Sequence, residues 1–304
     1  TGATWGLDRI DQRSLPMNGE YTFTSTGRGV TAYVVDTGIL ATHTQFTGRV
    51  LPGFTAFADG NGTNDCHGHG THVSGTIAGS TYGVAKDATL VPVRILSCAG
   101  SGTTSGVIAG IDWMISNHAT GVPAVANMSI GGGLSPSLNS AVDRAVADGI
   151  SIVVAAGNSN ADACKASPSS APSAITVGAT GSTDARASFS NFGSCVDVFA
   201  PGVSITSSYI RSTTDRTSMS GTSMASPHVA GVVALYLQSN PSATPAAVTS
   251  TLMAAATPNV VVDPGVASPN RLIYSGSFAP APATTPSAPT IATAVPGNAS
   301  VSLA

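Results

Sequence analysis

Apolar and polar positions follow two kinds of pattern along this chain. Short runs of β-branched and other apolar residues are typical of buried strands, and they lie at 30–36, 90–95, 124–128, 150–155, 174–178 and 196–199. Longer helix-like runs lie at 69–79, 104–118, 137–148, 223–239 and 245–256. The pair Thr244-Pro245 marks the start of the last run, since threonine caps helices and proline suits the first helical position.

Strands that alternate with helices predict an α/β fold with three layers, a mostly parallel central sheet covered by helices on both faces. In such sheets, binding sites form outside the carboxyl ends of the strands. Asp36, Ser129 and Asn158 lie at or just past three predicted strand ends. We therefore expect these residues to share one site.

The end of the chain has a different composition. After Tyr274 the segment SGSFAPAPATTPSAP is rich in Pro, Ala, Ser and Thr, which is typical of a linker. The last residues, TIATAVPGNASVSLA, resemble the opening strands of a fibronectin type III module, and a disordered tail is the alternative. We expect the folded unit to span residues 1–276 and the linker with this truncated module start to span 277–304.

Composition and charge exclude several functional classes. The 304 residues are 42% hydrophobic, enough for one large core. Charged residues make up only 9% of the chain, with a net charge of −3 and no basic cluster, so we expect no nucleic-acid partner. No stretch is long and apolar enough to suggest a membrane span. The chain starts at Thr1 without a signal-peptide pattern, as a processed, secreted product would.

The chain has four cysteines: Cys66, Cys98, Cys164 and Cys195. An even number of cysteines in a secreted chain suggests two disulfides. Four cysteines allow three pairings, and spacing alone does not choose among them. Four free thiols in the core are the alternative.

Ser223 is the first candidate for chemistry. It lies in GTSMASPHVAG, a turn of small residues that leads directly into an apolar helical run. The start of a helix has unpaired N–H groups and a positive dipole end, both of which favour developing negative charge. This position suits a nucleophile, although serine is also a common helix cap.

Two further segments place polar side chains among glycines. TAYVVDTGI ends a buried strand with Asp36, and DCHGHGTHVSGTIAG opens a helix with His69. Taken singly, such an Asp or the Asn158 of VVAAGNSN is usually a turn former, and a lone His is usually structural. Asp, His and Ser in this chain order, however, match the order found in subtilisin.

The chain thus resembles the subtilases, the subtilisin-like serine proteases. WGLDRIDQR at 5–13, SIGGG at 129–133 and SNFGSCVDVFAPG at 190–202 are similar to the proteinase K branch, nearest in pattern to its aqualysin-type secreted bacterial members. The resemblance covers residues 5–274. It implies a secreted, monomeric serine endopeptidase with a propeptide that acts as intramolecular chaperone and inhibitor. It also implies the pairings Cys66–Cys98 and Cys164–Cys195.

The resemblance assigns a role to each candidate. Ser223 attacks the peptide carbonyl, His69 takes and returns its proton, and Asp36 orients His69. Asn158 and the Ser223 N–H stabilise the oxyanion.

Glycine-rich edges leave backbone groups free to bind an extended peptide as an added strand. The resemblance places such edges on either side of the substrate, at Gly100, Ser101 and Gly102 and at Ser129, Ile130 and Gly131. The residue before the cleaved bond enters a pocket walled by Ile130, Ala155, Ala156 and Gly157. These small, uncharged walls predict broad specificity with a preference for apolar or aromatic residues. The alternative for SIGGG is a flexible turn.

The resemblance also implies one or two structural Ca²⁺ ions. One site matches Asp197 with the carbonyls of Pro172 and Ala174. A second matches five residues near the N-terminus: Asp8, Asp11, Gln12, Asn18 and Glu20. Ligation by oxygen alone suits calcium. The alternative for Asp8 and Asp11 is surface charge or ion pairs with Arg9 and Arg13.

Position 67 departs from the family pattern, since it is often Asn there and is His67 here. Together Cys66, His67, His69 and His72 resemble a soft-metal cluster, which makes a zinc hydrolase or metal-binding module a rival interpretation. The absence of HExxH and of paired CxxC motifs argues against it. A catalytically dead, peptide-binding relative is a third class, which the complete triad disfavours.

Overall fold

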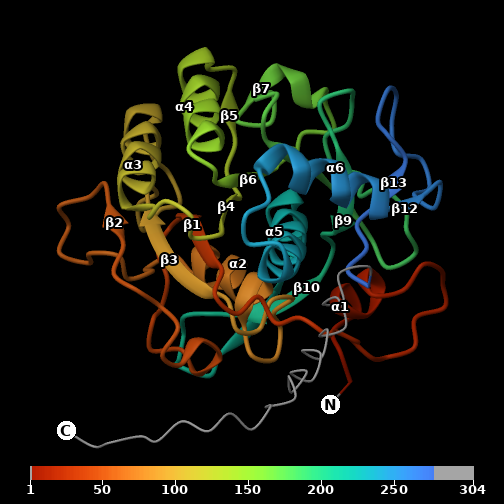
Figure 1. The fold of residues 1–304 in the computed structure, drawn as a ribbon, viewed down its shortest axis with the longest axis horizontal. Helices are drawn as coiled ribbons and strands as arrows, with labels where there is room; N and C mark the ends of the chain where they lie inside the picture. The colour runs from red at the N-terminus through yellow and green to blue at the C-terminus, as the bar shows by residue number, and fades with distance from the viewer. Residues whose placement is uncertain (1, 277–304) are drawn as a thin grey trace, which may run out of the picture.

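A nine-stranded sheet runs through the centre of the protein within residues 2–276, the part of the chain that the computed structural model describes (Figure 1). The strand order is β12-β13-β9-β8-β6-β4-β1-β3-β2. All neighbours pair in parallel except β12 and β13. The strand bounds are β1 Thr31–Asp36, β2 Phe54–Thr55, β3 Thr89–Arg94, β4 Ala124–Met128, β6 Ser151–Ala155, β8 Ile175–Thr180, β9 Val198–Pro201, β12 Thr257–Pro258 and β13 Arg271–Leu272. The predicted mostly parallel α/β sheet is confirmed.

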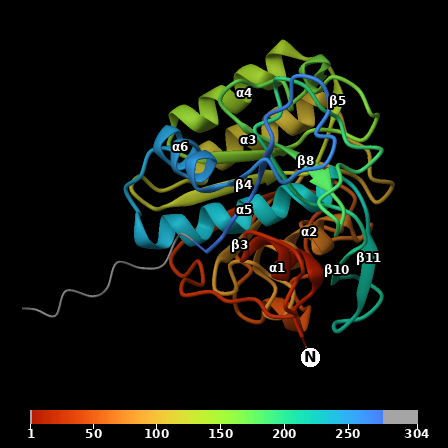
Figure 2. The ribbon, with the colours of Figure 1, turned by 90° about the vertical axis from the view of Figure 1, so that its right-hand side faces the viewer.

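Helices cover both faces of this sheet (Figure 2). The helix α3 (Thr104–Asn117) and the helix α4 (Pro136–Ala147) pack on one face, and α2 (His69–Ala78) and α5 (Thr222–Ser239) pack on the other. In β1, Ala32 and Val34 join the apolar cluster with α2 and α5, whereas Tyr33 and Val35 join the cluster with α3 and α4. Because side chains alternate along a strand, a strand buried on both faces reads as a continuous apolar run.

The predicted helices and the six predicted strands are all present, with ends shifted by a few residues. Thr244 caps α6 (Pro245–Ala255) through its hydroxyl, which accepts from the N–H of Ala247. The elements that the sequence pattern missed are short. They are α1 Trp5–Ile10, η1 Thr44–Phe46, η2 Ala163–Lys165, the sheet strands β2, β12 and β13, and the two-stranded pairs β10 Ile205–Ser208 with β11 Arg216–Met219 and β5 Gly132–Gly133 with β7 Ala166–Ser167. The predicted linker and module start at 277–304 lie outside the described residues. Among the helices of residues 2–276, none has the length and apolarity needed to cross a membrane.

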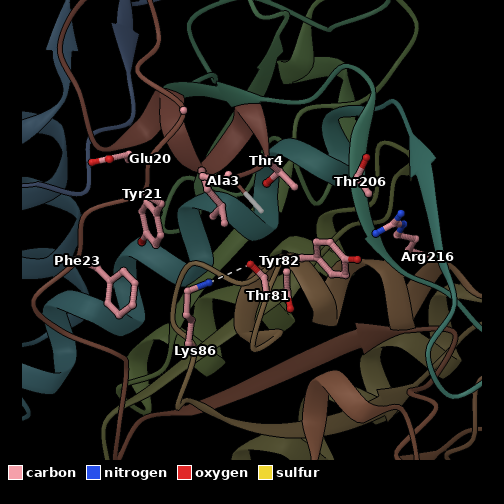
Figure 3. Close-up of a pocket in the computed structure, with 13 residues that line it drawn as sticks. Ala3, Thr4, Glu20, Tyr21, Phe23, Thr81, Tyr82, Lys86, Thr206 and Arg216 are labelled. Atoms are coloured by element: carbon pink, nitrogen blue, oxygen red, sulfur yellow. Dashed lines mark hydrogen bonds between the residues drawn. The ribbon is translucent and has the colours of Figure 1, made fainter.

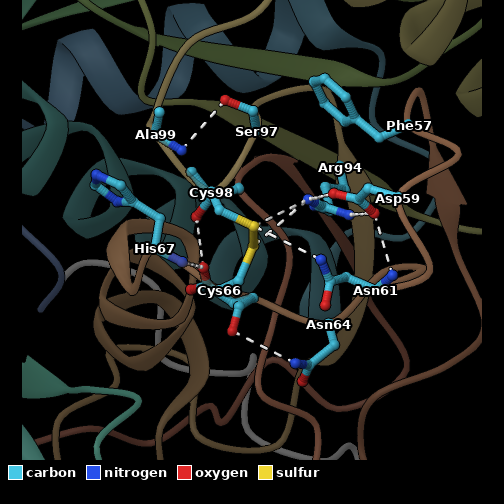
Figure 4. Close-up of a disulfide and its surroundings, with 12 residues drawn as sticks. Phe57, Asp59, Asn61, Asn64, Cys66, His67, Arg94, Ser97, Cys98 and Ala99 are labelled. Carbon is cyan, nitrogen blue, oxygen red and sulfur yellow. Dashed lines mark hydrogen bonds and ion pairs between the residues drawn. A yellow bond between two sulfur atoms is a disulfide. The ribbon is translucent and has the colours of Figure 1, made fainter.

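Two disulfides join the four cysteines as Cys66–Cys98 and Cys164–Cys195, so the alternative of free thiols is wrong. Cys66–Cys98 ties the turn before α2 to the loop after β3 (Figure 4). Arg94, at the end of β3, donates to both sulfur atoms and to the carboxylate of Asp59. Each bridge closes a loop of just over thirty residues, which is worth about 3–4 kcal/mol if it acts mainly on the unfolded chain.

Candidate active site

Asp36 and His69 form a hydrogen-bonded pair at the carboxyl end of β1. Asp36 is the last residue of β1 and is fully buried, while His69 is the first residue of α2. His69 Nδ1 lies 2.8 and 2.9 Å from the two carboxylate oxygens of Asp36. Since a carboxylate only accepts hydrogen bonds, this contact holds the proton on Nδ1 and leaves Nε2 available as a base.

Two opposing effects act on the pKa of His69. Burial lowers it, because the charged ring loses hydration, while the charge of Asp36 and its hydrogen bond raise it. A smaller contribution from the charge of Asp65 also raises it. The net result is a pKa above the ordinary value of 6.5.

Asp65 builds the turn that delivers His69 to the site, a role that the sequence analysis missed. One oxygen of its buried carboxylate accepts from the N–H groups of His67 and Gly68, and the other accepts from both the N–H and the hydroxyl of Thr71. Gly68 has φ +104°, a left-handed conformation that favours glycine. The only signal in the sequence was an Asp three residues before this glycine, within DCHGHGTH.

Ser223 lies in the first turn of α5, where its N–H has no acceptor within the helix. Its hydroxyl donates to the carbonyl of Ser129 at 3.1 Å, and Ser129 Oγ donates back to the carbonyl of Ser223 at 2.8 Å. No hydrogen bond joins Ser223 to His69 among the described residues. Catalytic contacts of this kind are often formed only when substrate binds.

A chain of buried hydrogen bonds fixes the start of α5 against the end of β4. Ser226 donates to Asn127 Oδ1 at 2.7 Å, and Asn127 Nδ2 donates to Ser129 Oγ at 2.8 Å. The exchange between Ser129 and Ser223 completes this chain. Asn127 and Ser226 are therefore positioning residues that the sequence analysis did not single out.

The side chain of Asn158 is held in place through its oxygen, which leaves its amide nitrogen available to donate to a substrate. Asn158 Oδ1 accepts from both the N–H and the hydroxyl of Thr222, at 2.8 and 2.9 Å. A Cβ atom placed on Gly221 would lie 3.6 Å from Asn158 Nδ2 and 3.6 Å from the backbone nitrogen of Ser223. Two N–H donors near one open point can together bind a developing oxyanion.

A cavity of about 290 Å³ opens beside these donors. Ser129, Ile130, Ala155, Gly157, Asn158 and Ser223 are among the residues that line it, and none of its lining residues carries a charge. Ala156, another predicted wall residue, is fully buried in an apolar cluster with Val196 and Phe199. Asn191, which also lines the cavity, donates from its amide nitrogen to the carbonyl of Ala156.

The two predicted peptide-binding edges line the same cavities. Gly100, Ser101 and Gly102 line one cavity of about 310 Å³ together with Ile130 and Gly131. Gly100, Ile130 and Gly131 also line a neighbouring cavity of about 280 Å³ that includes His67 and His69. Side chains added at Gly131 or Gly132 would meet no neighbour, so these glycines leave the edge open.

Four of the five predicted N-terminal calcium ligands gather near α1. Asp8 accepts from the N–H groups of Asn18 and Gly19, and Asn18 Oδ1 accepts from the N–H of Glu20. One oxygen of Asp11 accepts from Thr22, while the other is buried without a partner. Burial raises the pKa of Asp11, and the nearby charge of Asp8 raises it further. The hydrogen bond from Thr22 lowers the pKa, but the net change is upward.

The ion pairs considered as an alternative for Asp8 and Asp11 do not form. Arg9 makes a buried pair with Asp184 at 2.6 Å, and Arg13 donates to the carbonyl of Ala255. Asp11 therefore has a buried oxygen without a partner, which a bound cation would explain and a simple surface charge would not.

Glu20 differs from the other predicted ligands, because its exposed side chain lines a separate cavity of about 460 Å³ beside Tyr21 and Phe23 (Figure 3). Lys86 lies in the same cavity, where it donates to the carbonyls of Thr81 and Gly83. Burial lowers the pKa of Lys86 to about 8.

The second predicted calcium site is centred on Asp197. One oxygen of Asp197 accepts from the N–H of Thr176 at 2.8 Å, and burial raises the pKa of this carboxyl. Pro172 and Ala174 lie in the turn that leads into β8, two to four residues before Thr176. Ca²⁺ binds carboxylate and backbone carbonyl oxygens, and this buried carboxylate lies near a turn that offers such carbonyls. The arrangement is therefore compatible with calcium.

The rival soft-metal cluster does not form. The sulfur of Cys66 is committed to a disulfide, and His72 is fully buried with Nε2 bonded to the carbonyl of Ile205. Within residues 2–276, no three His, Cys, Asp or Glu side chains come together in a way that could hold a metal ion.

Comparisons with known proteins place the chain in a family. The model of the subtilase family matches residues 27–273. The chain is 60% identical to an extracellular serine proteinase of Thermus sp. (strain Rt41A), over 90% of this chain and 66% of that protein. It is 56% identical to alkaline serine exoprotease A of Vibrio alginolyticus, over 90% of this chain and 51% of that protein.

A crystal structure of a cold-adapted subtilisin-like serine proteinase superposes with a TM-score of 0.87 at 54% identity, covering 90% of this chain and 99% of that one. The chain spans about two thirds and one half of the length of the Thermus and Vibrio relatives. The family model covers most of this chain, and the fold agrees with that of the subtilisin-like structure. The chain therefore belongs to the subtilase family of serine proteases.

Proposed function

We propose that this chain is the catalytic unit of a secreted serine endopeptidase that hydrolyses peptide bonds through an acyl-enzyme. The observation that carries the proposal is the bond from His69 Nδ1 to buried Asp36, which leaves Nε2 available as a base. Ser223 and Asn158 lie at the same edge of the sheet, since Ser223 contacts Ser129 after β4 and Asn158 follows β6. The family match and the names of the relatives support it.

Catalysis begins when Ser223 Oγ attacks the peptide carbonyl and His69 Nε2 takes its proton. Asp36 stabilises the imidazolium that forms, and the N–H groups of Asn158 and Ser223 bind the oxyanion. His69 then gives the proton to the leaving amine, and a water molecule repeats the sequence to release the acyl group. For this to happen, Ser223 must exchange its bond to Ser129 for one to His69.

Covalent labelling tests this proposal. A serine-directed phosphonyl or sulfonyl fluoride should modify Ser223 and abolish hydrolysis, and a zinc-selective chelator at constant calcium should leave hydrolysis intact. Loss of hydrolysis with that chelator, and no adduct on Ser223, would instead support the zinc hydrolase. An unreactive Ser223 in a chain that still binds peptides would support the dead, peptide-binding relative.

The uncharged cavity beside Ser223 sets the proposed specificity. Peptides with Phe, Leu or Ala before the cleaved bond should be hydrolysed faster than peptides with Lys or Asp. A charged side chain would lose hydration there without finding a partner, and such a loss is costly. The measurement is kcat/KM for a series of chromogenic peptides that differ at this one residue. A profile dominated by Lys or Arg would contradict the proposed pocket.

Structural calcium is part of the proposal. Asp8, Asp11, Gln12 and Asn18 would hold one ion, with Glu20 as a further ligand if its side chain turns inward, and Asp197 with the Pro172 and Ala174 carbonyls would hold another. The orphaned Asp11 oxygen supports the first site and the buried Asp197 carboxyl supports the second. When bound, the ions supply positive charge that offsets these carboxylates, and they take no part in the reaction.

Calcium removal should lower the melting temperature by about 5 °C or more, because an ion that binds only the folded state stabilises it by mass action. The measurement compares millimolar calcium with chelator in a Ser223→Ala background, which prevents autolysis. Asp11→Asn and Asp197→Asn should each reduce this calcium-dependent shift, whereas the exposed Asp112→Asn should leave it unchanged. A shift of the same size in all three variants would contradict both sites.

Secretion, a propeptide that assists folding and then inhibits, and a monomeric state complete the proposal. The two disulfides and the extracellular Thermus relative support secretion. The proposed partners are protein and peptide substrates.

A further inference from the structure

His67 has no role in the mechanism above, and its ring is unusually free. Its Nδ1 atom is buried without a hydrogen-bond partner, and no hydrogen bond joins its Nε2 atom to another described residue. A side chain at Gly100 would lie 2.9 Å from Nε2, so the glycine there leaves this nitrogen room. A half-turn about the bond from Cβ to the ring would exchange Nδ1 with Cδ2 and Nε2 with Cε1, and it would break no hydrogen bond.

His67 and His69 line the same cavity at the mouth of the cleft, together with Thr37, Leu96 and Gly100. Their ring centres are 6.3 Å apart, with the rings inclined at 67°. With metal–nitrogen bonds of about 2.0–2.1 Å, one ion held by two imidazoles places their ring centres roughly 5–6.5 Å apart, depending on the angle at the metal. The observed separation lies near the upper end of this range, so an ion that bridges the rings as they stand would need a nearly straight angle at the metal, and a more bent angle would bring the rings closer together.

The charges around the pair favour a cation. Asp36 and Asp65 are both buried carboxylates beside His69, and their charges act on its ring. His69 commits Nδ1 to Asp36 and keeps Nε2 as a lone-pair donor, and a carboxylate on the other nitrogen is the usual support of a metal-binding histidine.

We propose that His67 and His69 form a two-histidine site for a borderline-soft divalent ion, Zn²⁺ or Cu²⁺, which reversibly inhibits the enzyme by occupying the Nε2 atom of His69. Neutral imidazole nitrogens are preferred ligands of these ions. The bound ion would block the base that must take the proton of Ser223. The inhibitory effect rests on the proposed function, whereas binding of the ion does not.

Isothermal titration of Zn²⁺ into the Ser223→Ala protein, with millimolar Ca²⁺ present throughout, tests binding without any need for activity. We expect one site with micromolar affinity. Adding His67→Asn should weaken it by about tenfold or more, since the loss of even an outer partner of a metal ligand typically costs 10- to 100-fold. The matched control is His118→Asn, because both ring nitrogens of His118 are already bonded, to Asp148 and to the carbonyl of Val122.

Equal affinity with and without His67→Asn would overturn the site, and so would an equal loss in the His118→Asn control. Imidazole NMR of the Ser223→Ala protein gives a second measurement that needs no change at His67. Zn²⁺ should shift the ring signals of both His67 and His69, and a shift of only one ring, or of neither, would refute the bridge.

Inhibition is measured separately, as the ratio of peptide hydrolysis with and without micromolar Zn²⁺ in each protein. This ratio should fall strongly in the native chain and recover in His67→Asn, and equal sensitivity in both would overturn the inhibitory role. If no hydrolysis were found at all, the proposed function would fail, while the titration and NMR results would still decide the metal site.

Discussion

Replacing Ser223 by alanine should lower peptide hydrolysis by about 10⁶-fold, the size of the loss seen when subtilisin loses its serine or histidine alone. The reason is that the hydroxyl forms the covalent bond to substrate, so no neighbouring group can replace it. Steady-state turnover of a chromogenic peptide with an apolar residue before the cleaved bond measures the effect.

The fold should survive this change. Ser223 Oγ makes a single hydrogen bond, to the Ser129 carbonyl, so its loss costs about 1 kcal/mol. The melting temperature in calcium should therefore stay close to that of the native chain. Ser220→Ala is a matched control three residues upstream, because the exposed Ser220 only accepts from the N–H of Ser204 and should be dispensable. Retention of most activity by Ser223→Ala would remove the nucleophile from the proposal.

Much of the fold could be predicted from the sequence, because long buried elements leave strong patterns. The run that ends at Asp36 is apolar on both faces of β1, and the runs that became α3 and α5 are long enough to read as helices. The helix α1 and the strands β5 and β7 are too short to carry a recognisable period, and they form because the rest of the chain places them.

The candidate site shows the same division. Asp36, His69 and Ser223 could be identified because they lie in distinctive motifs in a known order. The residues that position them could not. Thr222 and Asn127 act through contacts with residues distant in sequence, and Asp65 joins its own turn to the distant Thr37. Spacing also could not show that Ala156 is fully buried in an apolar cluster, because the direction of a side chain after a strand depends on the local turn. The disulfide pairing came from the family resemblance and is confirmed.

Asp36 should also be highly sensitive to substitution. Asp36→Asn should lower kcat near neutral pH by about 10⁴-fold, the loss known for the equivalent change in a chymotrypsin-type triad. An asparagine can donate to His69 Nδ1, which favours the tautomer with the proton on Nε2, and that tautomer cannot accept the proton of Ser223.

The pH dependence of kcat/KM gives this prediction a second readout. His69 must be neutral to act as a base, and its pKa lies above 6.5 in the native protein, so kcat/KM should fall as the pH drops through that raised pKa. Asp36→Asn removes the charge that raises the pKa of His69, while the burial that lowers it remains. The acidic limb of the residual activity should therefore move to lower pH.

The matched control for this prediction is Asp112→Asn, since Asp112 is half exposed and pairs only with Arg144, away from the site. That variant should keep both the native turnover and the native pH profile. An Asp36→Asn enzyme with turnover within about tenfold of native would show that Asp36 does not set the tautomer of His69. A limb that moved to higher pH would show that another group controls the charge of His69, and the triad assignment would then have to be replaced.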